Sequence, residues 1–399
     1  MKKIVLFITV AVMSIVSAFS FAACDIDGFF NDVKNTVMGF LGISEEENKD
    51  EHGHTHEGSD YKDIEVATAD ISVHFLELGN KYTGDCTLIK TGNTELLIDC
   101  GSKTSSISTV SEYLRGYVTD GIIEYVIVTH AHEDHYAGFA TSEKQNSIFD
   151  LFDCRTIITF SYSNQKETAA MYNNFFRELA DEVALGATHY TADKCYNRTD
   201  GAQRVYALEN GYEFEILYNK FYFEKASSGE NDHSVCCMVQ GNGKHFLLTG
   251  DLEEKGEKFL ADKYKEDHPD VNFSAFRVDL YKAGHHGSKT SSSAYFLNVF
   301  KPLRCCVCCC AGSPEYTKTP ENQFPTQKFV DNIAPYTFEV YVTTLCVDYD
   351  KNEYKSFNGN IIITVKGADI GLKCSDNDTP LKDSEWFKAN RTTPAAWAS

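Results

Sequence analysis

The chain has 399 residues, of which 42% are hydrophobic and 13% aromatic, so it can bury a sizeable hydrophobic core. Its formal net charge of −21 argues against a non-specific nucleic-acid-binding module, because contacts to phosphates need Lys and Arg. That charge does not exclude a metal site that holds a single phosphodiester.

Residues 1–23 have the pattern of an export signal, since Lys2 and Lys3 precede an apolar run that ends at Ala23. The tetrapeptide Phe-Ala-Ala-Cys that ends at Cys24 resembles a bacterial lipobox, which implies that Cys24 carries a lipid in the mature protein. The alternatives are a plain secretory signal and a retained membrane anchor. We therefore expect an exported protein, held at the extracellular face of the cell membrane or secreted.

Residues 24–66 are predicted to form a lipidated N-terminal segment and a linker. Apolar residues recur at helical spacing between Phe29 and Leu41, which favours a short amphipathic helix. The stretch from Ser44 to Asp60 is acidic and has no apolar periodicity, which is typical of a linker. Its three alternating histidines, His52 to His56, either hold a metal ion weakly or belong to a solvated tether.

Residues 67–370 are predicted to form one layered α/β domain, because short β-rich runs alternate with helical patterns. The predicted strands cover residues 71–79, 86–92, 95–101, 122–130, 214–218, 234–239, 245–251, 278–284, 305–310, 337–344 and 360–365. The predicted helices cover residues 105–118, 166–184, 252–265, 294–300 and 326–333. Residues 371–399 are polar and are expected to form a loosely packed tail.

Five of the fourteen cysteines lie in the sequence CCVCCC, residues 305–310. Adjacent residues of an extended chain point to opposite faces, so these thiols cannot all bind one ion. The run is instead predicted to be a buried strand in which Cys acts as a small hydrophobic residue. Without Cys24 the number of cysteines is odd and their spacing shows no disulfide framework.

The sequence VTHAHEDHYAG, residues 128–138, places three histidines and two carboxylates directly after a predicted strand. His130 and His132 can point the same way and hold one metal ion, while Asp134 and His135 turn toward a second. Imidazole and carboxylate ligands suit Zn²⁺ and similar ions. Two such ions can share and activate one water molecule for attack on an ester.

This H-x-H-x-D-H pattern, with further motifs in order behind it, resembles the metallo-β-lactamase fold over residues 71–367. The resemblance implies an α/β architecture, an αββα four-layer sandwich. It implies that Asp99 in LLIDCG supports the metal ligands, and that Asp251 in LLTGD bridges the two metals. In KAGHHGSKTSS, one of His285 and His286 would be a ligand of the second metal.

Within this superfamily the chain resembles the hydrolase domain of competence proteins attached to DNA-uptake channels. The likeness lies in LELGNKYTGDCTLIKTGNTELLIDCG, NDHSVCCMVQGNGKHFLLTGD and GHHGSKTSS. That branch generally lacks a further histidine that completes metal site 1 elsewhere in the superfamily. His189 and His233 are candidates for this place, and water or Asn231 would complete the site otherwise.

We therefore predict an extracellular metal-dependent hydrolase with two Zn²⁺ ions, or Mn²⁺, and with catalysis dependent on Asp134. A phosphodiester is the favoured substrate, either a small or cell-envelope phosphoester or a nucleic acid that acts as substrate only. Ser288, Lys289 and Lys282 are candidate contacts to its phosphate. The alternative is a non-catalytic surface lipoprotein that binds metal or the cell wall on the same fold.

Overall fold

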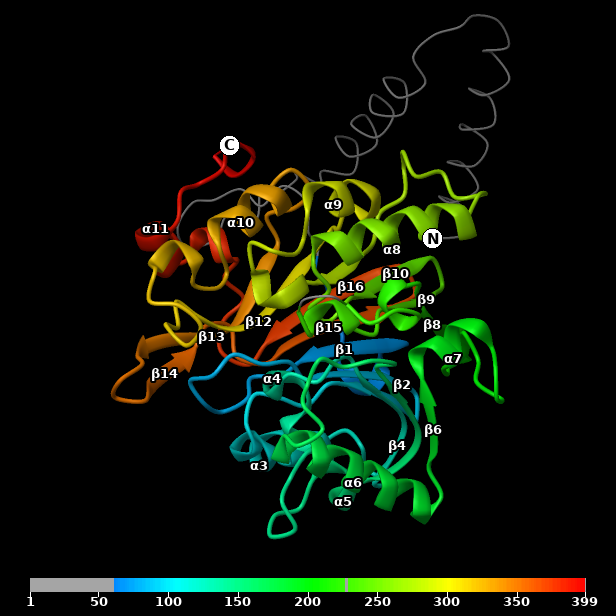
Figure 1. Cartoon of the computed structure of the whole chain (residues 1–399). Helices are drawn as coiled ribbons and strands as arrows, with labels where there is room; N and C mark the ends of the chain where they lie inside the picture. Colours follow the sequence, from blue (N-terminus) through cyan, green and yellow to red (C-terminus); the bar gives the residue numbers. More distant parts are fainter. Residues whose placement is uncertain (1–60, 227–228, 399) are drawn as a thin grey trace, which may run out of the picture. The chain divides into compact units, whose positions relative to one another are not determined.

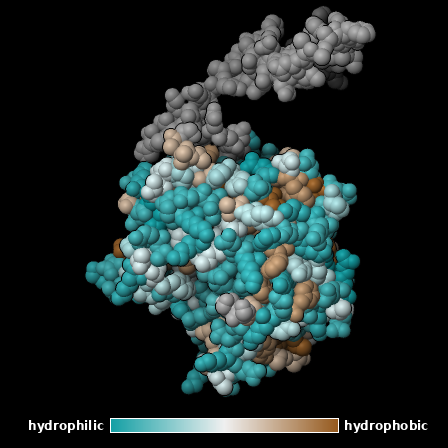
Figure 2. Space-filling view, turned by 45° about the horizontal axis from the view of Figure 1, so that its top comes forward, coloured by the Kyte–Doolittle hydropathy of each residue, from teal (hydrophilic) through white to brown (hydrophobic). Residues whose placement is uncertain are grey.

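The computed structural model describes residues 61–226 and 229–398, and residues 61–399 form one compact unit. The predicted export signal, the lipidation site Cys24, the amphipathic helix and the acidic linker up to Asp60 lie outside the described residues. Within the described part of the chain, no helix combines the length and apolarity needed to cross a membrane. The face of the domain in Figure 2 is largely hydrophilic, with small separate apolar areas.

Two eight-stranded mixed sheets pack face to face (Figure 1). The first has the order β16-β15-β1-β2-β3-β4-β5-β6, and its strands are β1 Ile71–Phe75, β2 Thr87–Thr91, β3 Thr94–Ile98, β4 Ile122–Val128, β5 Asp153–Thr159, β6 Thr188–Thr191, β15 Ile361–Lys366 and β16 Asp369–Cys374. The second has the order β14-β13-β12-β11-β10-β9-β8-β7, and its strands are β7 Val205–Ala207, β8 Tyr212–Ile216, β9 Cys237–Gly241, β10 Lys244–Leu248, β11 Leu280–Lys282, β12 Cys305–Ala311, β13 Val340–Asp348 and β14 Glu353–Ser356.

Helices cover the outer face of each sheet (Figure 1). The first sheet carries α3 Ile107–Arg115, α5 Ile148–Leu151 and α6 Ala170–Leu185, while the short helix α4 Glu133–Tyr136 follows the carboxyl end of β4 and α7 Ala192–Asn197 lies beside the sheet edge. The second sheet carries α8 Glu254–Asp267, α9 Ala294–Phe300, α10 Gln327–Ile333 and α11 Glu385–Asn390. The predicted four-layer αββα sandwich of the metallo-β-lactamase fold is confirmed.

Strand β12 shows how the layers are held together. All of its residues are buried, and they alternate between two hydrophobic cores. Cys306 and Cys308 point into the core between the sheets, whereas Cys305, Val307 and Cys309 point into the core under α8, α9 and α10. The thirteen cysteines of the described residues are all free. The prediction of a buried strand with Cys as a small hydrophobic residue is confirmed.

The ends of the domain differ from those predicted. The boundary at residue 370 falls inside β16, which pairs with β15 along its whole length, and the segment beyond it buries Leu381, Phe387 and Trp397 in the second core. Residues 371–398 are therefore part of the domain and do not form a loosely packed tail. At the other end, Lys62 N–H donates to Ile370 C=O at 2.9 Å, so the packed chain begins before residue 67. Three apolar side chains spread over a polar segment show no periodicity, which is why the sequence did not reveal this packing.

The parallel strands of both sheets position the site. β3 and β4 are parallel in the first sheet, and β10 to β13 are parallel in the second. The carboxyl ends of parallel strands meet at one edge of a sheet, where side chains from several loops can converge. Asp99 follows β3, the H-x-H-x-D-H motif follows β4, Asp251 follows β10, and His285 and His286 follow β11.

Candidate metal centre

The first motif begins at the end of β4 and runs into the short helix α4. His132 is still extended, with φ −94° and ψ 146°, and the helix begins at Glu133, so the chain turns between the two halves of the motif. The tight approach of the β3 loop depends on a glycine, because a Cβ at Gly101 would lie 1.7 Å from the Asp134 carbonyl oxygen. His130 and His135 are fully buried.

His135 is oriented by Asp99. The Nδ1 atom of His135 lies 2.8 Å from Asp99 Oδ2, and Asp99 also accepts hydrogen bonds of 2.7 Å each from the N–H and hydroxyl of Thr129. A carboxylate behind an imidazole fixes its tautomer with the proton on Nδ1. The lone pair on Nε2 of His135 is therefore directed toward the centre of the site. The sequence resemblance implied this supporting position for Asp99.

His286 is oriented in the same way from the other sheet. It lies in the 3₁₀ segment η6 (Gly284–Gly287), where His285 and His286 both have positive φ values, 46° and 55°. Such left-handed backbone is unfavourable for histidine by about 1–3 kcal/mol and persists only where the surroundings impose it. His286 Nδ1 donates to the carbonyl of Cys308 at 2.7 Å, so its Nε2 also faces the centre.

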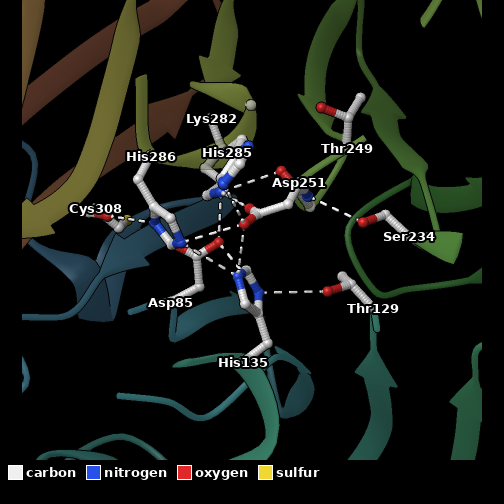
Figure 3. A network of polar contacts seen from close by, with 12 residues as sticks. Asp85, Thr129, His135, Ser234, Thr249, Asp251, Lys282, His285, His286 and Cys308 are labelled. Atoms are coloured by element: carbon white, nitrogen blue, oxygen red, sulfur yellow. Dashed lines mark hydrogen bonds and ion pairs between the residues drawn. The ribbon is translucent and has the colours of Figure 1, made fainter. Parts of the chain in front are cut away.

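The side chains of His135, His286 and Asp251 converge on one point (Figure 3), and Asp134 lies beside them. The Nε2 atoms of His135 and His286 lie 3.3 Å apart, and Asp251 Oδ2 lies 3.1 Å from the first and 3.3 Å from the second. Asp134 Oδ2 lies 3.4 Å from His286 Nε2. Two imidazole lone pairs and two carboxylates that face one point need a cation between them. The donor set therefore fits a metal ion such as Zn²⁺.

The electrostatics of the cluster show the same demand for positive charge. Burial lowers the pKa of His135 and His286, but the negative charge of Asp251, with Asp99 at His135 and Asp85 at His286, outweighs it and holds both pKa values well above the usual range. Burial likewise raises the pKa of Asp251, but the charges of the two histidines outweigh it and hold that pKa well below its usual range.

Asp85, just before β2, was not among the predicted site residues. It forms a buried group with His135, Asp251 and His286, in which the ligand-type atoms lie within 4.8 Å of one another. However, Asp85 lies on the far side of both rings, 3.6 Å from His135 Nδ1 and 3.3 Å from His286 Nδ1. We therefore assign Asp85 to the support of the two histidines and Asp134 to the side that faces the ion.

Lys282, the last residue of β11, is the fixed cation of the site. Its ammonium pairs with Asp85 Oδ2, lies 3.7 Å from Asp251 Oδ1 and donates to the Gly250 carbonyl at 3.3 Å. Burial lowers its pKa, but the charges of Asp85 and Asp251 outweigh this effect and raise it, so the ammonium stays charged. Lys282 is 3% exposed and does not reach solvent as a contact to a substrate phosphate would.

Comparison with known proteins identifies the family to which this arrangement belongs. Residues 79–146, which contain the whole His130–His135 motif, match the family model described as Metallo-beta-lactamase superfamily. The chain is a metallo-β-lactamase superfamily protein. It is related to competence proteins, as the sequence resemblance predicted.

Two curated relatives illustrate the relation within the superfamily. Recombination protein 2 of Haemophilus influenzae is 27% identical over 221 residues, which is 55% of this chain and 22% of that protein. Competence protein ComA of Neisseria gonorrhoeae is 36% identical over 93 residues, which is 23% of this chain and 12% of that protein. The chain therefore spans less than a quarter of the length of these relatives.

Solved structures of the superfamily are more distant. The metallo-β-lactamase fold protein YhfI of Bacillus subtilis has a TM-score of 0.29 and 13% identity, over 53% of this chain and 71% of that one. A diphosphatase of the PhnP family has a TM-score of 0.32 and 10% identity, over 59% of this chain and 85% of that one.

The other predicted pair of superfamily ligands, His130 and His132, lies beside the central cluster. His130 Nε2 is 3.1 Å from His132 Nδ1, and His130 Nδ1 faces the hydroxyls of Thr129 at 3.1 Å and Ser234 at 3.4 Å. Neighbouring Asn231, in η5 (Asn231–His233), donates from its amide to Glu253 at 3.2 Å. Its buried Oδ1 has no hydrogen-bond partner among the described residues. The amide nitrogen of Asn231 also faces His285 Nδ1 at 3.4 Å, and a role for Asn231 at metal site 1 stays a prediction.

The two alternative histidines for metal site 1 are directed elsewhere. His189 lies on the edge strand β6, and its Nε2 contacts the Thr159 hydroxyl at 2.9 Å. His233 is buried near the rings of Tyr162 and Phe221, with centroid distances of 6.4 and 6.5 Å. The structure brings neither side chain to His130 and His132 by a hydrogen bond or ring contact.

The rim of the site is formed by His285 and the turn behind it. His285 is 21% exposed and lies 3.9 Å from Asp251 Oδ2, so it is His286 that joins the buried cluster. His285 Nδ1 contacts the Thr290 hydroxyl at 3.0 Å. Ser288 contacts the same hydroxyl at 3.1 Å, and Lys289 donates to Asn322 at 2.9 Å, away from the cluster. Lys289, one of the candidate contacts to a substrate phosphate, is thus directed along the surface.

Proposed function

We propose that the chain is a metal-dependent phosphodiester hydrolase, exported and attached to the outer face of the cell membrane by a lipid on Cys24. The observation that carries the hydrolase proposal is the convergence of His135, His286, Asp134 and Asp251 on one point. Each histidine is held with its Nε2 lone pair inward, and the site lies at the carboxyl ends of parallel strands.

Zinc, or manganese in its place, would polarise the substrate and activate a water molecule when bound. The chain holds the reacting groups around it. Asp251 Oδ2 lies between the His135 and His286 nitrogens, and its Oδ1 faces Lys282, so this carboxylate cannot swing out of the site. His285, partly exposed at the rim, is placed to donate a hydrogen bond to a substrate oxygen.

A phosphodiester is favoured by the relation to competence and recombination proteins, since recombination acts on DNA, whose strands are phosphodiesters. The net charge of −21 repels long polyanions, so a small or cell-envelope phosphodiester is preferred over a nucleic acid strand. A nucleic acid would enter only as a substrate, because the chain carries 37 basic against 58 acidic residues.

The test uses the full chain purified in mild detergent. Metal content is measured by elemental mass spectrometry, and turnover is measured on bis-p-nitrophenyl phosphate and on the carboxylic ester p-nitrophenyl acetate. We expect bound zinc or manganese and hydrolysis of the phosphodiester. Asp134→Ala should lower turnover by more than the roughly 10- to 100-fold that loss of a supporting residue costs.

The matched control is Asp262→Ala on α8, whose carboxylate is 38% exposed and pairs with Lys258 outside the site. It should leave both metal content and turnover unchanged. A chain that binds metal but hydrolyses neither ester would contradict the proposal, and would favour a non-catalytic lipoprotein that binds metal or the cell wall. Hydrolysis of the acetate alone would contradict the choice of phosphodiester.

A further inference from the structure

The four side chains of the central cluster differ in how they are held. His135 is held by Asp99, and His286 by the Cys308 carbonyl and Asp85, all of them buried. Asp251 faces Lys282. Among the described residues, the only hydrogen bond to the Asp134 carboxylate from outside the histidine cluster comes from Tyr316, whose hydroxyl donates to Oδ2 at 2.6 Å.

Asp134 is also the most exposed member of the cluster. Its side chain is 14% exposed, whereas those of His135 and His286 are 0% and that of Asp251 is 1% exposed. An ion that enters or leaves the cluster therefore passes on the Asp134 side. If the Asp134 carboxylate rotated freely, it would open the path by which an ion leaves the cluster. If the carboxylate is held in position, it stays a ligand of the ion.

Tyr316 reaches Asp134 from the opposite sheet, on the loop between β12 and η7 (Pro320–Asn322). Its ring packs on Phe324 with a centroid distance of 5.6 Å, and Phe324 packs on the rings of His285 and His286 at 5.7 and 5.8 Å. The ring is nevertheless 55% exposed, so the side chain stands between the cluster and solvent.

The loop of Tyr316 is tied to the loop that carries Asp85. Glu315 accepts a hydrogen bond of 3.0 Å from the Thr83 backbone N–H, and the Thr83 hydroxyl accepts one of 3.3 Å from the Cys310 N–H. The backbone next to Tyr316 is therefore anchored, and the phenol is presented to Asp134 without the entropy cost of ordering a free loop.

We infer that Tyr316 is a positioning residue for the metal centre, whose hydroxyl holds Asp134 toward the ion and slows loss of the ion to solvent. This inference rests on the metal centre of the proposed function, but not on its phosphodiester substrate. Loss of a residue that supports a metal ligand typically weakens metal binding by about 10- to 100-fold.

The chain offers a matched control for the hydrogen bond. Tyr295 on α9 is 42% exposed, and its hydroxyl also donates to an aspartate, Asp262 on α8, outside the site. Tyr316→Phe and Tyr295→Phe thus remove the same kind of bond from two exposed tyrosines. Tyr316→Leu, in addition, removes the ring that packs on Phe324 and separates packing from hydrogen bonding.

The experiment measures Zn²⁺ affinity by competition with a chromophoric chelator, and the release rate by a chelator chase, on full-length chains. We expect Tyr316→Phe and Tyr316→Leu to bind Zn²⁺ about 10- to 100-fold more weakly and to release it faster, while Tyr295→Phe matches the wild type. Metal-free melting temperatures of Tyr316→Phe and the wild type should agree, which shows that the fold is intact.

Different results overturn different claims. A wild-type chain that takes up no metal refutes both the proposed function and this inference. A wild type that binds Zn²⁺, with Tyr316→Phe within about twofold of it, refutes the inference alone. If Tyr316→Phe keeps wild-type affinity and only Tyr316→Leu loses it, the ring acts through packing and the hydroxyl does not position Asp134.

Discussion

Lys282 is a buried cation, and its removal tests the electrostatics of the site. The side chains of Lys282, Asp85 and Asp251 are 3%, 3% and 1% exposed, so water screens their interactions very little. At the 3.7 Å between Lys282 Nζ and Asp251 Oδ1, two unit charges attract by about 4 kcal/mol at an effective dielectric of about 20. Part of this attraction offsets the cost of burying the ammonium itself.

Lys282→Met fills the same volume but leaves Asp85 and Asp251 buried without their fixed counter-charge. Breaking a buried ion pair from one side typically costs about 3–5 kcal/mol. We expect a loss of this size in the free energy of urea unfolding of the chain in EDTA. With Zn²⁺ bound, the loss should be smaller, because the ion neutralises Asp251 while Asp85 stays unpaired.

Two further variants show whether the loss is electrostatic. Adding Asp85→Asn to Lys282→Met removes the uncompensated charge and should recover at least about 1 kcal/mol. Lys258→Met, which removes a 61% exposed partner of Asp262, should cost less than about 1 kcal/mol. A Lys282→Met chain that unfolds within about 1 kcal/mol of the wild type in EDTA would refute the reasoning.

Two other regions carry predictions for stability. Burial, with a smaller effect of Lys90, lowers the pKa of His74 to about 3, so between about pH 6.5 and 3 the unfolded chain binds a proton that the folded chain excludes. The resulting contribution to the free energy of unfolding is complete above about pH 6.5 and declines as the pH falls, by about 2 kcal/mol between pH 7 and pH 5. His74→Gln should remove this part of the pH dependence, which urea titrations at several pH values measure. Phe387, in the C-terminal segment, is buried beside Trp397, and Phe387→Ala should lower the free energy of unfolding by about 3–5 kcal/mol in thermal unfolding. A loss below about 1 kcal/mol would mean that this segment contributes little to the core.

Elements with a clear hydrophobic period could be predicted from the sequence. The helix predicted at residues 294–300 is α9, and the one predicted at 326–333 is α10, which begins one residue later. The strands β5, β6, β7, β14 and β16 were not predicted. Three of them have four residues or fewer, and strand β5 carries charged residues at alternate positions that give no apolar run.

Part of the candidate metal centre could be located from the sequence because one turn of backbone supplies several of its residues. His130, His132, Asp134 and His135 lie within six residues, so their spacing alone restricts where the side chains can go. The choice between His285 and His286 could not be made from spacing. It depends on the positive φ of both residues and on the carbonyl of Cys308, which lies 22 residues away.

The residues that hold the ligands come from distant parts of the chain, and no local pattern marks them. Asp85 stands in the Gly-Asp pair of the first strands, yet its role appears only where β11 brings Lys282 to it. Tyr316 lies 182 residues from Asp134 and in no motif. The ligand motif therefore predicts that a metal can bind, whereas the affinity and the rate of exchange depend on supporting contacts that only the fold assembles. Two chains with the same motif could differ greatly in how tightly they hold the ion, which is why Tyr316 and Lys282 are the informative positions to change.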